Sequence, residues 1–288
     1  MRNRLFSLFL FLFIFLMSFS AQGTEQFNFD VTEIEILENG NKFIGTNRGK
    51  ITTGDGVEIE ADKFEYIKDI NLLNASGNVK IIDNINNYLI FTNNLIYKKN
   101  ENIILTKKNS KAISSKDKIE ILANDFEYDR SKNIIYAKEN VIIEDKLEDY
   151  KIYSDFVTYE LNKEKIYTNG QTSGQIHSKY EFNSEDIIFS KNIMELKSQK
   201  KMTIRDNFNL YNVKNFIYYI ESEELKGENL LITSNYNKPS SDKFYFSSAI
   251  VNLKNNDFIA KDTVIKIHKD IFDDSNNDPR LVGVSSNK

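Results

Sequence analysis

The chain has 288 residues, a formal net charge of −4 and no cysteine. The absence of cysteine excludes a disulfide framework, a lipid-modified N-terminal cysteine and a zinc site built on thiolates. The acidic side chains outnumber the basic ones, 42 to 38, so nothing favours nucleic acid as a partner, because nucleic-acid-binding domains usually carry a basic stripe. Fifteen tyrosines and only two prolines favour extended strands over disorder.

The N-terminus has the features of a secretory signal peptide. Arg2 and Arg4 precede an apolar run from Leu5 to Phe19, and Ala21-Gln22-Gly23 supplies small residues two positions apart. The alternative is an uncleaved membrane anchor, but the run is shorter than the roughly 20 residues that a spanning helix needs. We therefore expect residues 1–23 to be removed on export.

A repeat of about 31 residues runs through the rest of the chain. Columns at this spacing hold tyrosine, aliphatic, aromatic, small or asparagine residues: Tyr66, Tyr97, Tyr128 and Tyr159; Ile59, Ile90, Ile121 and Ile152; Phe64, Leu95, Phe126 and Val157; Leu73, Ile104, Ile135 and Ile166; Ala61, Thr92, Ala123 and Ser154; Asn71, Asn102 and Asn133. The register is least regular between Ile204 and Ile220, and a last unit runs from Phe244 to Val264. Self-similarity at a fixed period is typical of stacked repeat proteins, and about six units are expected here.

Within each unit the hydrophobic period is two, which is typical of strands with one buried face. In the first unit, apolar and acidic residues alternate from Val57 to Ala61. Phe64 and Tyr66 continue the alternation after a slip of one residue, which predicts a bulge or bend. The polar segment Lys68–Asn71 then predicts a tight turn before a second strand. Each unit is therefore predicted to be two strands joined by a turn.

These units predict an all-β fold over residues 24–270. A single two-stranded unit cannot bury its apolar face, but stacked units share a continuous inner face. We expect a folded-over jellyroll or solenoid-like stack whose end strands are open. Another β-domain can add to such an edge through backbone hydrogen bonds.

Two stretches of the repeat resemble the organic-solvent-tolerance family. The first is Ile59-Glu60-Ala61-Asp62-Lys63-Phe64-Glu65-Tyr66, followed by Ala75-Ser76-Gly77-Asn78-Val79-Lys80-Ile81. The second is Ala123-Asn124-Asp125-Phe126-Glu127-Tyr128, followed by Ala137-Lys138-Glu139-Asn140-Val141-Ile142-Ile143. The resemblance extends over Phe27 to Lys269, and the order and repetition of these short motifs make it specific. It implies the β-jellyroll of the lipopolysaccharide transport bridge.

Within that family, the chain most resembles the periplasmic jellyroll of the outer-membrane assembly member. Residues 271–288 are similar to the linker that joins this jellyroll to a large barrel. A barrel of about two dozen strands does not fit in the remaining sequence. We therefore expect a fragment of a longer protein, and the alternative is a member without the barrel. Many outer-membrane members carry cysteines that link the jellyroll to the barrel, and this chain has none.

The resemblance implies lipopolysaccharide transport and assembly at the outer membrane by an exported periplasmic domain that is not an enzyme and needs no cofactor. The implied partners are lipopolysaccharide and other jellyroll proteins of the bridge, joined by edge-strand addition. A further possible partner is an outer-membrane plug lipoprotein, which would bind the missing barrel. A stand-alone soluble bridge protein is the alternative within the family.

An apolar groove that is open on one side suits a lipid carrier, because each buried methylene contributes roughly 0.8 kcal/mol. The alternative is a purely structural role, in which the same residues only fill a dry core. The groove candidates are Ile59, Phe64, Tyr66, Ile90, Leu95, Tyr97, Ile121, Phe126 and Tyr128.

Two functions of other classes remain open. A carbohydrate-active β-solenoid enzyme would need a unique pair of carboxylates in different environments, whereas acidic residues such as Asp62 and Asp125 recur in every unit. His177 and His268 lack the spacing of metal ligands, so we expect no catalytic, cofactor-binding or metal residues. A purely structural or adhesive repeat protein is the other alternative.

Overall fold

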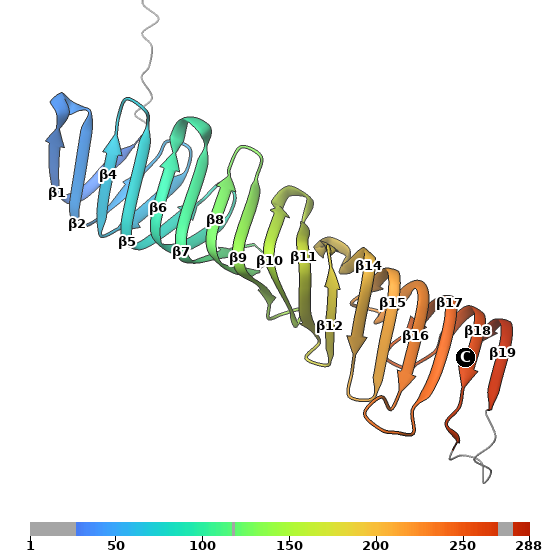
Figure 1. Ribbon diagram of the computed structural model, residues 1–288. Helices are drawn as coiled ribbons and strands as arrows, with labels where there is room; N and C mark the ends of the chain where they lie inside the picture. Colours follow the sequence, from blue (N-terminus) through green and yellow to red (C-terminus); the bar gives the residue numbers. More distant parts are fainter. Residues whose placement is uncertain (1–26, 117–118, 270–278) are drawn as a thin grey trace, which may run out of the picture.

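The computed structural model describes residues 27–116, 119–269 and 279–288, and this part of the chain forms one 19-stranded antiparallel sheet (Figure 1). Four single-turn 3-10 helices lie in the turns: η1 (Glu38–Gly40), η2 (Lys99–Glu101), η3 (Leu161–Lys163) and η4 (Lys191–Ile193). The strands are β1 (Asn28–Leu37), β2 (Lys42–Thr52), β3 (Val57–Ala61), β4 (Lys63–Ile67), β5 (Leu72–Asp83), β6 (Tyr88–Lys98), β7 (Ile103–Ser114), β8 (Glu120–Asp129), β9 (Ile134–Asp145), β10 (Tyr150–Glu160), β11 (Lys165–Ile176), β12 (Tyr180–Glu185), β13 (Ile188–Ser190), β14 (Glu195–Arg205), β15 (Asn209–Tyr219), β16 (Glu224–Ser234), β17 (Asp242–Asn252), β18 (Phe258–Lys266) and β19 (Arg280–Asn287). None of the described helices is long and apolar enough to span a membrane. The predicted all-β fold is confirmed.

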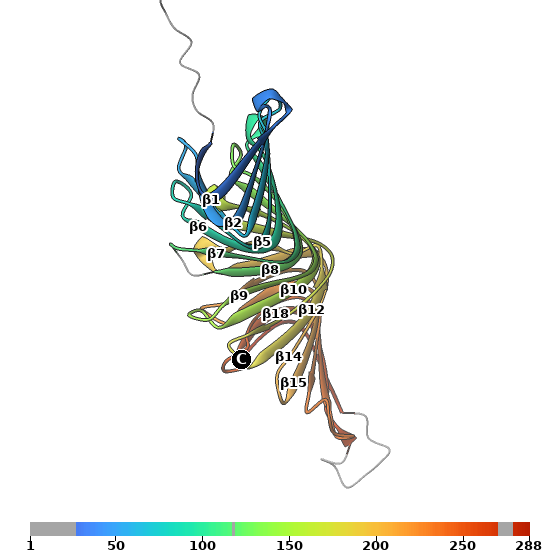
Figure 2. The same cartoon turned by 90° about the vertical axis from the view of Figure 1, so that its left-hand side faces the viewer.

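Most strands bend in the middle. The register of β5 with β6 shifts between Ser76 and Val79, and Gly77 and Asn78 both adopt positive φ angles, +77° and +46°. Asp62 interrupts one such bent strand, so that its two halves are β3 and β4. This is the bend that the one-residue slip between Ala61 and Phe64 predicts. Figure 2 shows that the bends fold the sheet over on itself.

The folded sheet has two walls, which we name by the turns at their free ends. Wall A ends in row A, the turns at residues 38–41, 68–71, 99–102, 130–133, 161–164, 191–194, 220–223 and 253–257. Wall B ends in row B, which includes the turns at residues 53–56, 84–87, 115–116, 146–149, 177–179, 206–208 and 235–241. The two rows face each other across what we call the mouth, opposite the bends.

The hydrophobic core fills the space between the walls. Wall B contributes Ile59, Ile90 and Ile121, which are at most 1% exposed, and wall A contributes Phe64 and Phe126, which are 1% and 2% exposed. One continuous cluster of buried apolar side chains runs from the start of β1 to β18. The repeat columns therefore mark inward-facing positions, and consecutive units stack them into a single core.

The asparagine column forms a ladder in row A. Asn71 has a φ of +51°, and its carbonyl oxygen accepts a hydrogen bond of 3.1 Å from the Lys99 backbone N–H in the next turn. Its side-chain amide donates to Asn100 Oδ1 at 2.9 Å, and its Oδ1 accepts from the Tyr66 hydroxyl at 2.9 Å. Asparagine suits this position because it tolerates left-handed backbone and supplies polar atoms.

Replacing Asn71 with alanine should lower the free energy of unfolding by about 2 kcal/mol, because the change removes two side-chain hydrogen bonds and places a β-carbon in left-handed backbone. Asn71→Gly loses the same hydrogen bonds without the conformational cost, so it should lose about half as much. Urea unfolding monitored by circular dichroism measures both. Equal losses for the two variants would show that left-handed backbone is not what selects asparagine here.

Two regions differ from the sequence analysis. The stretch between Ile204 and Ile220, where the repeat is weakest, holds the end of β14, a row B turn and all of β15, which pairs with β14 from Arg205↔Leu210 to Glu195↔Tyr219. Residues 280–287, which the sequence analysis assigned to a linker, form β19 and pair with β18 from Lys266↔Arg280 to Ile259↔Asn287. Their short apolar run lacks a counterpart in the repeat columns, so the pattern did not identify a strand there. The predicted signal peptide, residues 1–23, lies outside the described residues.

Candidate functional site

The structure places the nine groove candidates inside the fold, between walls A and B. Their exposed fractions lie between 0% and 6%: Ile59, Phe64, Tyr66, Ile90, Leu95, Tyr97, Ile121, Phe126 and Tyr128. The columns are therefore brought together as expected, but the expected groove accessible from one side is not open in this structure. The side chains fill the core instead.

Two features close the interior. Aromatic rings from the two walls contact each other: Phe27, which precedes β1, lies 4.9 Å from Tyr66 between ring centroids, and Tyr150 of wall B lies 5.0 Å from Phe189 of wall A. Polar side chains from rows A and B also bond across the mouth. The interior is therefore closed at the mouth in this structure.

The strongest bonds across the mouth form around Arg130, a row A residue. Its Nε lies 2.8 Å from Asp83 Oδ2, and its Nη1 lies 2.6 Å from Asp55 Oδ2. Nη1 also donates to the Tyr97 hydroxyl at 2.9 Å, and Nη2 donates to the Asp55 carbonyl oxygen at 3.1 Å. One guanidinium thus joins two row B turns to wall A. We call these residues, together with Lys99 and Tyr128, the clasp.

Lys99 and Tyr128 complete the clasp from row A and the end of wall A. Lys99 Nζ lies 2.5 Å from Asp55 Oδ2, and the Tyr128 hydroxyl donates to Asp83 Oδ2 at 3.1 Å. Asp83 is 1% exposed, and the side chain of Arg130 is 6% exposed. A buried carboxylate is tolerated because cationic and hydroxyl donors surround it.

The cations of the clasp keep its two carboxylates ionised. Burial by itself would raise the pKa of Asp83, but hydrogen bonds from Arg130 and Asn86 outweigh it and hold that pKa below its usual 3.8. Asp55 behaves in the same way: burial opposes ionisation, and hydrogen bonds from Lys99 and Arg130 lower its pKa. Burial raises the pKa of Tyr97 to about 12, so its hydroxyl keeps its proton at neutral pH. The clasp therefore combines two carboxylates, two cations and the hydroxyls of Tyr97 and Tyr128.

Because the pKa of Asp83 is lowered in the folded protein, the free energy of unfolding should fall at acidic pH. Because the folded pKa is below that of the unfolded chain, about 3.9, the stabilisation is complete above that pH and is lost as the pH falls through the folded value. We expect the wild type to lose more stability between about pH 5 and about pH 3 than Asp83→Asn does. Urea unfolding at the two pH values measures this difference. The control is Asp69→Asn, on an exposed turn of row A, and it should lose as much stability between the two pH values as the wild type does. If Asp83→Asn loses as much stability as the wild type, the role of the Asp83 carboxylate is contradicted.

Similar polar bridges recur along the mouth. Lys116 Nζ lies 3.5 Å from Glu164, and Lys179 Nζ lies 3.1 Å from Glu223 Oε2. Further along the stack, the Tyr211 hydroxyl donates to Asn256 Oδ1 at 2.8 Å, 45 residues away in the chain. These bonds join a row B turn or the strand beside it to row A.

Sequence reasoning missed the clasp. The sequence pattern did not single out Arg130, Asp55 or Asp83, and it predicted Tyr97 and Tyr128 to line the groove. One signal was present: Asp83 precedes Arg130 by 47 residues, which is about one and a half repeats. Row A and row B turns alternate along the chain about half a repeat apart. Two residues separated by one and a half repeats therefore lie at opposite sides of the mouth.

The described residues contain no group of three or more histidine, cysteine, aspartate or glutamate side chains that could hold a metal ion. The two histidines lie in or beside separate row B turns, and the His268 backbone N–H donates to Asp242 Oδ1 at 2.8 Å.

The chain matches no protein-family model and no curated protein sequence. Among solved structures it is similar to LptH, described as the LptA homologous periplasmic component of the conserved lipopolysaccharide transport device from Pseudomonas aeruginosa. The TM-score is 0.24 at 9% identity, and the match covers 51% of this chain and 84% of that one. A likeness this distant does not assign the chain to a family.

Proposed function

We propose that the chain carries lipopolysaccharide across the periplasm, with the acyl chains held between walls A and B and the sugars in water. The observation that carries the proposal is the continuous apolar core between two walls that are joined by backbone at the bends and by polar side chains at the mouth. Separating the walls at the mouth would open one uninterrupted trough, lined by the nine groove candidates.

The energetics suit reversible loading. About ten buried methylenes, at roughly 0.8 kcal/mol each, contribute about 8 kcal/mol when an acyl chain leaves water. Opening exposes apolar side chains of both walls, but the entering acyl chain covers the same surface again. The remaining cost is the breaking of the bonds across the mouth, and a carrier must be able to reverse this step to release its cargo.

The clasp also supplies charges where the head group of a bound lipid would lie. Arg130 and Lys99 face Asp55 and Asp83 at the mouth. An anionic head group would compete with these carboxylates for the two cations. Arginine in particular binds carboxylate and phosphate oxygens with the same fork of donors. Exchange of an aspartate for a head-group anion would compensate for part of the cost of opening.

The end strands support the assembly part of the proposal. Within the described residues, β1 pairs only with β2 and β19 pairs only with β18. Ile36 on β1 is 58% exposed, and Val282 and Val284 on β19 are 79% and 83% exposed. Free backbone edges with apolar side chains accept further strands. In the proposal, other jellyroll domains add at these edges and extend the trough, and the chain acts as the jellyroll of the outer-membrane assembly member.

A photo-crosslinking amino acid at Phe126, between the walls, tests the proposal against a purely structural repeat. The matched control is the same amino acid at Phe91, which is 38% exposed on the outer face. In cells that make lipopolysaccharide, ultraviolet light should join it to the Phe126 variant and not to the Phe91 variant. Circular dichroism of both purified variants shows whether they are folded. A folded Phe126 variant that captures no lipopolysaccharide would overturn the lipid-carrier function.

A further inference from the structure

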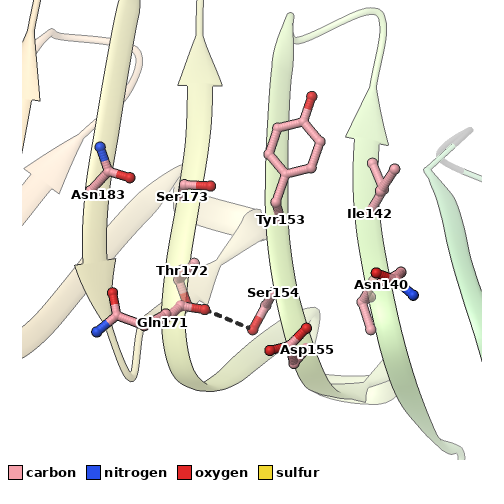
Figure 3. Close-up of a pocket in the computed structure, with 10 residues that line it drawn as sticks. Asn140, Ile142, Tyr153, Ser154, Asp155, Gln171, Thr172, Ser173 and Asn183 are labelled. Carbon is pink, nitrogen blue, oxygen red and sulfur yellow. Dashed lines mark hydrogen bonds between the residues drawn. The ribbon is translucent and has the colours of Figure 1, made fainter.

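A hollow of about 370 Å³ lies on the outer face of wall B, at the bends of β9 to β12 (Figure 3). Its lining includes side chains from all four strands: Asn140, Tyr153, Asp155, Gln171, Ser173 and Asn183. None of the nine groove candidates lines it. The hollow therefore shares no residue with the groove candidates or with the clasp, and Val141 at its base belongs to the core cluster.

The hollow arises where the repeat changes. Tyr153 lies beside Ile142 of β9 on one side and Ser173 of β11 on the other. Two units earlier, the matching Phe91 lies between Lys80 and Lys111, both long side chains. The short side chain at Ser173 therefore leaves the space beside the Tyr153 ring unfilled. Figure 3 shows this gap between Tyr153 and Asn183 of β12.

The groups that line the hollow are suited to a neutral, hydroxyl-rich ligand. The Tyr153 ring is 36% exposed. Within the described residues, no protein hydrogen bond involves the side chains of Tyr153, Asp155, Ser173 or Asn183, so their donors and acceptors are available to a ligand. Amide, hydroxyl and carboxylate groups bind hydroxyls by donating and accepting hydrogen bonds.

Other ligand classes fit less well. No lysine or arginine lines the hollow, and Asp155 contributes a negative charge. Lys151 Nζ lies 5.8 Å from the Tyr153 ring centroid, but this cation is already paired with Glu144 Oε1 at 3.7 Å, so an anion such as phosphate is disfavoured. Ile142, Val141 and the tyrosine ring are its main apolar parts, which is little surface for an acyl chain. A sugar combines hydroxyls with an apolar C–H face, and that face can pack on an exposed aromatic ring. Phe156, which is 50% exposed, lies just beyond the bulge of β10.

We propose that this hollow binds a short oligosaccharide. The Tyr153 ring packs against one sugar ring, and the side chains of Asp155, Ser173 and Asn183 bind its hydroxyls. The proposal does not depend on acyl chains entering between the walls, because the hollow faces outward.

Titration of the exported chain, residues 24–288, with chitotriose, maltotriose and lipid-free core oligosaccharide tests the proposal. Chemical-shift changes in nitrogen-15 spectra should locate at least one of these sugars at Tyr153, Asp155, Ser173 and Asn183, with a Kd on the order of 1 mM or tighter, as expected for an open site. Inorganic phosphate and decanoate are titrated in parallel and should cause no change at these four outward-facing residues. Any change that decanoate causes at interior residues reports on the space between the walls and not on the hollow.

Three variants make the test specific. Ser173→Ile restores the residue of the preceding unit, Ile142, and should weaken sugar binding at least tenfold by filling the hollow. Tyr153→Ala should have a similar effect. Phe91→Ala removes an equally exposed aromatic side chain from the same face and should leave binding unchanged. Binding that is as tight in Ser173→Ile as in the wild type would overturn the proposal, and so would the failure of all three sugars, or binding of phosphate or decanoate instead.

Discussion

Replacing Arg130 with methionine is expected to lower the free energy of unfolding by about 3–5 kcal/mol, the range for breaking a buried ion pair by removing one partner. The variant leaves the Asp83 carboxylate, which is 1% exposed, without its cationic donor. It also removes the hydrogen bonds to Tyr97 and to Asp55 across the mouth. Urea unfolding at neutral pH, monitored by circular dichroism, measures the loss.

The matched control is Arg205→Met. Arg205 also pairs with a carboxylate, Glu181, but the two side chains are 51% and 49% exposed. Ion pairs in water contribute little, so this variant should unfold close to the wild type. A second variant, Arg130→Met combined with Asp83→Asn, removes the unpaired charge and should recover part of the stability. Equal losses for Arg130→Met and Arg205→Met would show that the clasp does not hold the walls together.

Replacing Phe126 with alanine should also cost about 3–5 kcal/mol, because the change removes a buried ring and leaves a cavity between the walls. Phe126 is 2% exposed, and Phe156, on the other side of the sheet, is 50% exposed and provides the control. Phe156→Ala should change the unfolding midpoint little. The cavity of Phe126→Ala is apolar, and such cavities take up small apolar ligands. Benzene, which matches the missing ring, should therefore restore part of the stability of Phe126→Ala and should not stabilise the wild type.

A small loss in Phe126→Ala, comparable with that in Phe156→Ala, would mean that the interior is loosely packed. A large loss that benzene does not reduce would mean that the walls close around the cavity and fill it.

The strands were predictable because every unit needs an apolar side chain at each inward-facing position, so the same residue types recur at a fixed spacing. The alternation from Val57 to Ala61 predicts the strand, and the slip before Phe64 predicts its bend. The turn is predicted by the polar segment that ends at Asn71. Each of these signals lies within one unit. β19 was missed because a single strand at the end of the stack has no following unit to which its pattern can be compared.

The clasp and the hollow were not predictable in this way. Arg130 contacts Asp55 and Asp83 only because the folded sheet brings rows A and B together. The local sequence of one row does not show which residues of the other row it faces. The hollow depends on one short residue, Ser173, beside Tyr153 on the outer face. The predicted groove is closed in this structure. Alternation shows which side chains point inward but not how closely two walls approach.

The central claim is that the walls separate at the mouth to admit acyl chains, and locking them together tests it most directly. The sequence has no cysteine, so Lys116→Cys with Glu164→Cys places a unique pair across the mouth, where the native side chains lie 3.5 Å apart. A cleavable bis-maleimide would join the pair. The control pair, Ile85→Cys with Lys116→Cys, joins two turns of row B without crossing the mouth.

Binding of purified lipopolysaccharide is then compared before cross-linking, after cross-linking and after cleavage of the linker. The proposed mechanism predicts that the lock across the mouth lowers binding at least tenfold, that cleavage restores it, and that the control lock has little effect. Undiminished binding by the locked protein would contradict entry between the walls.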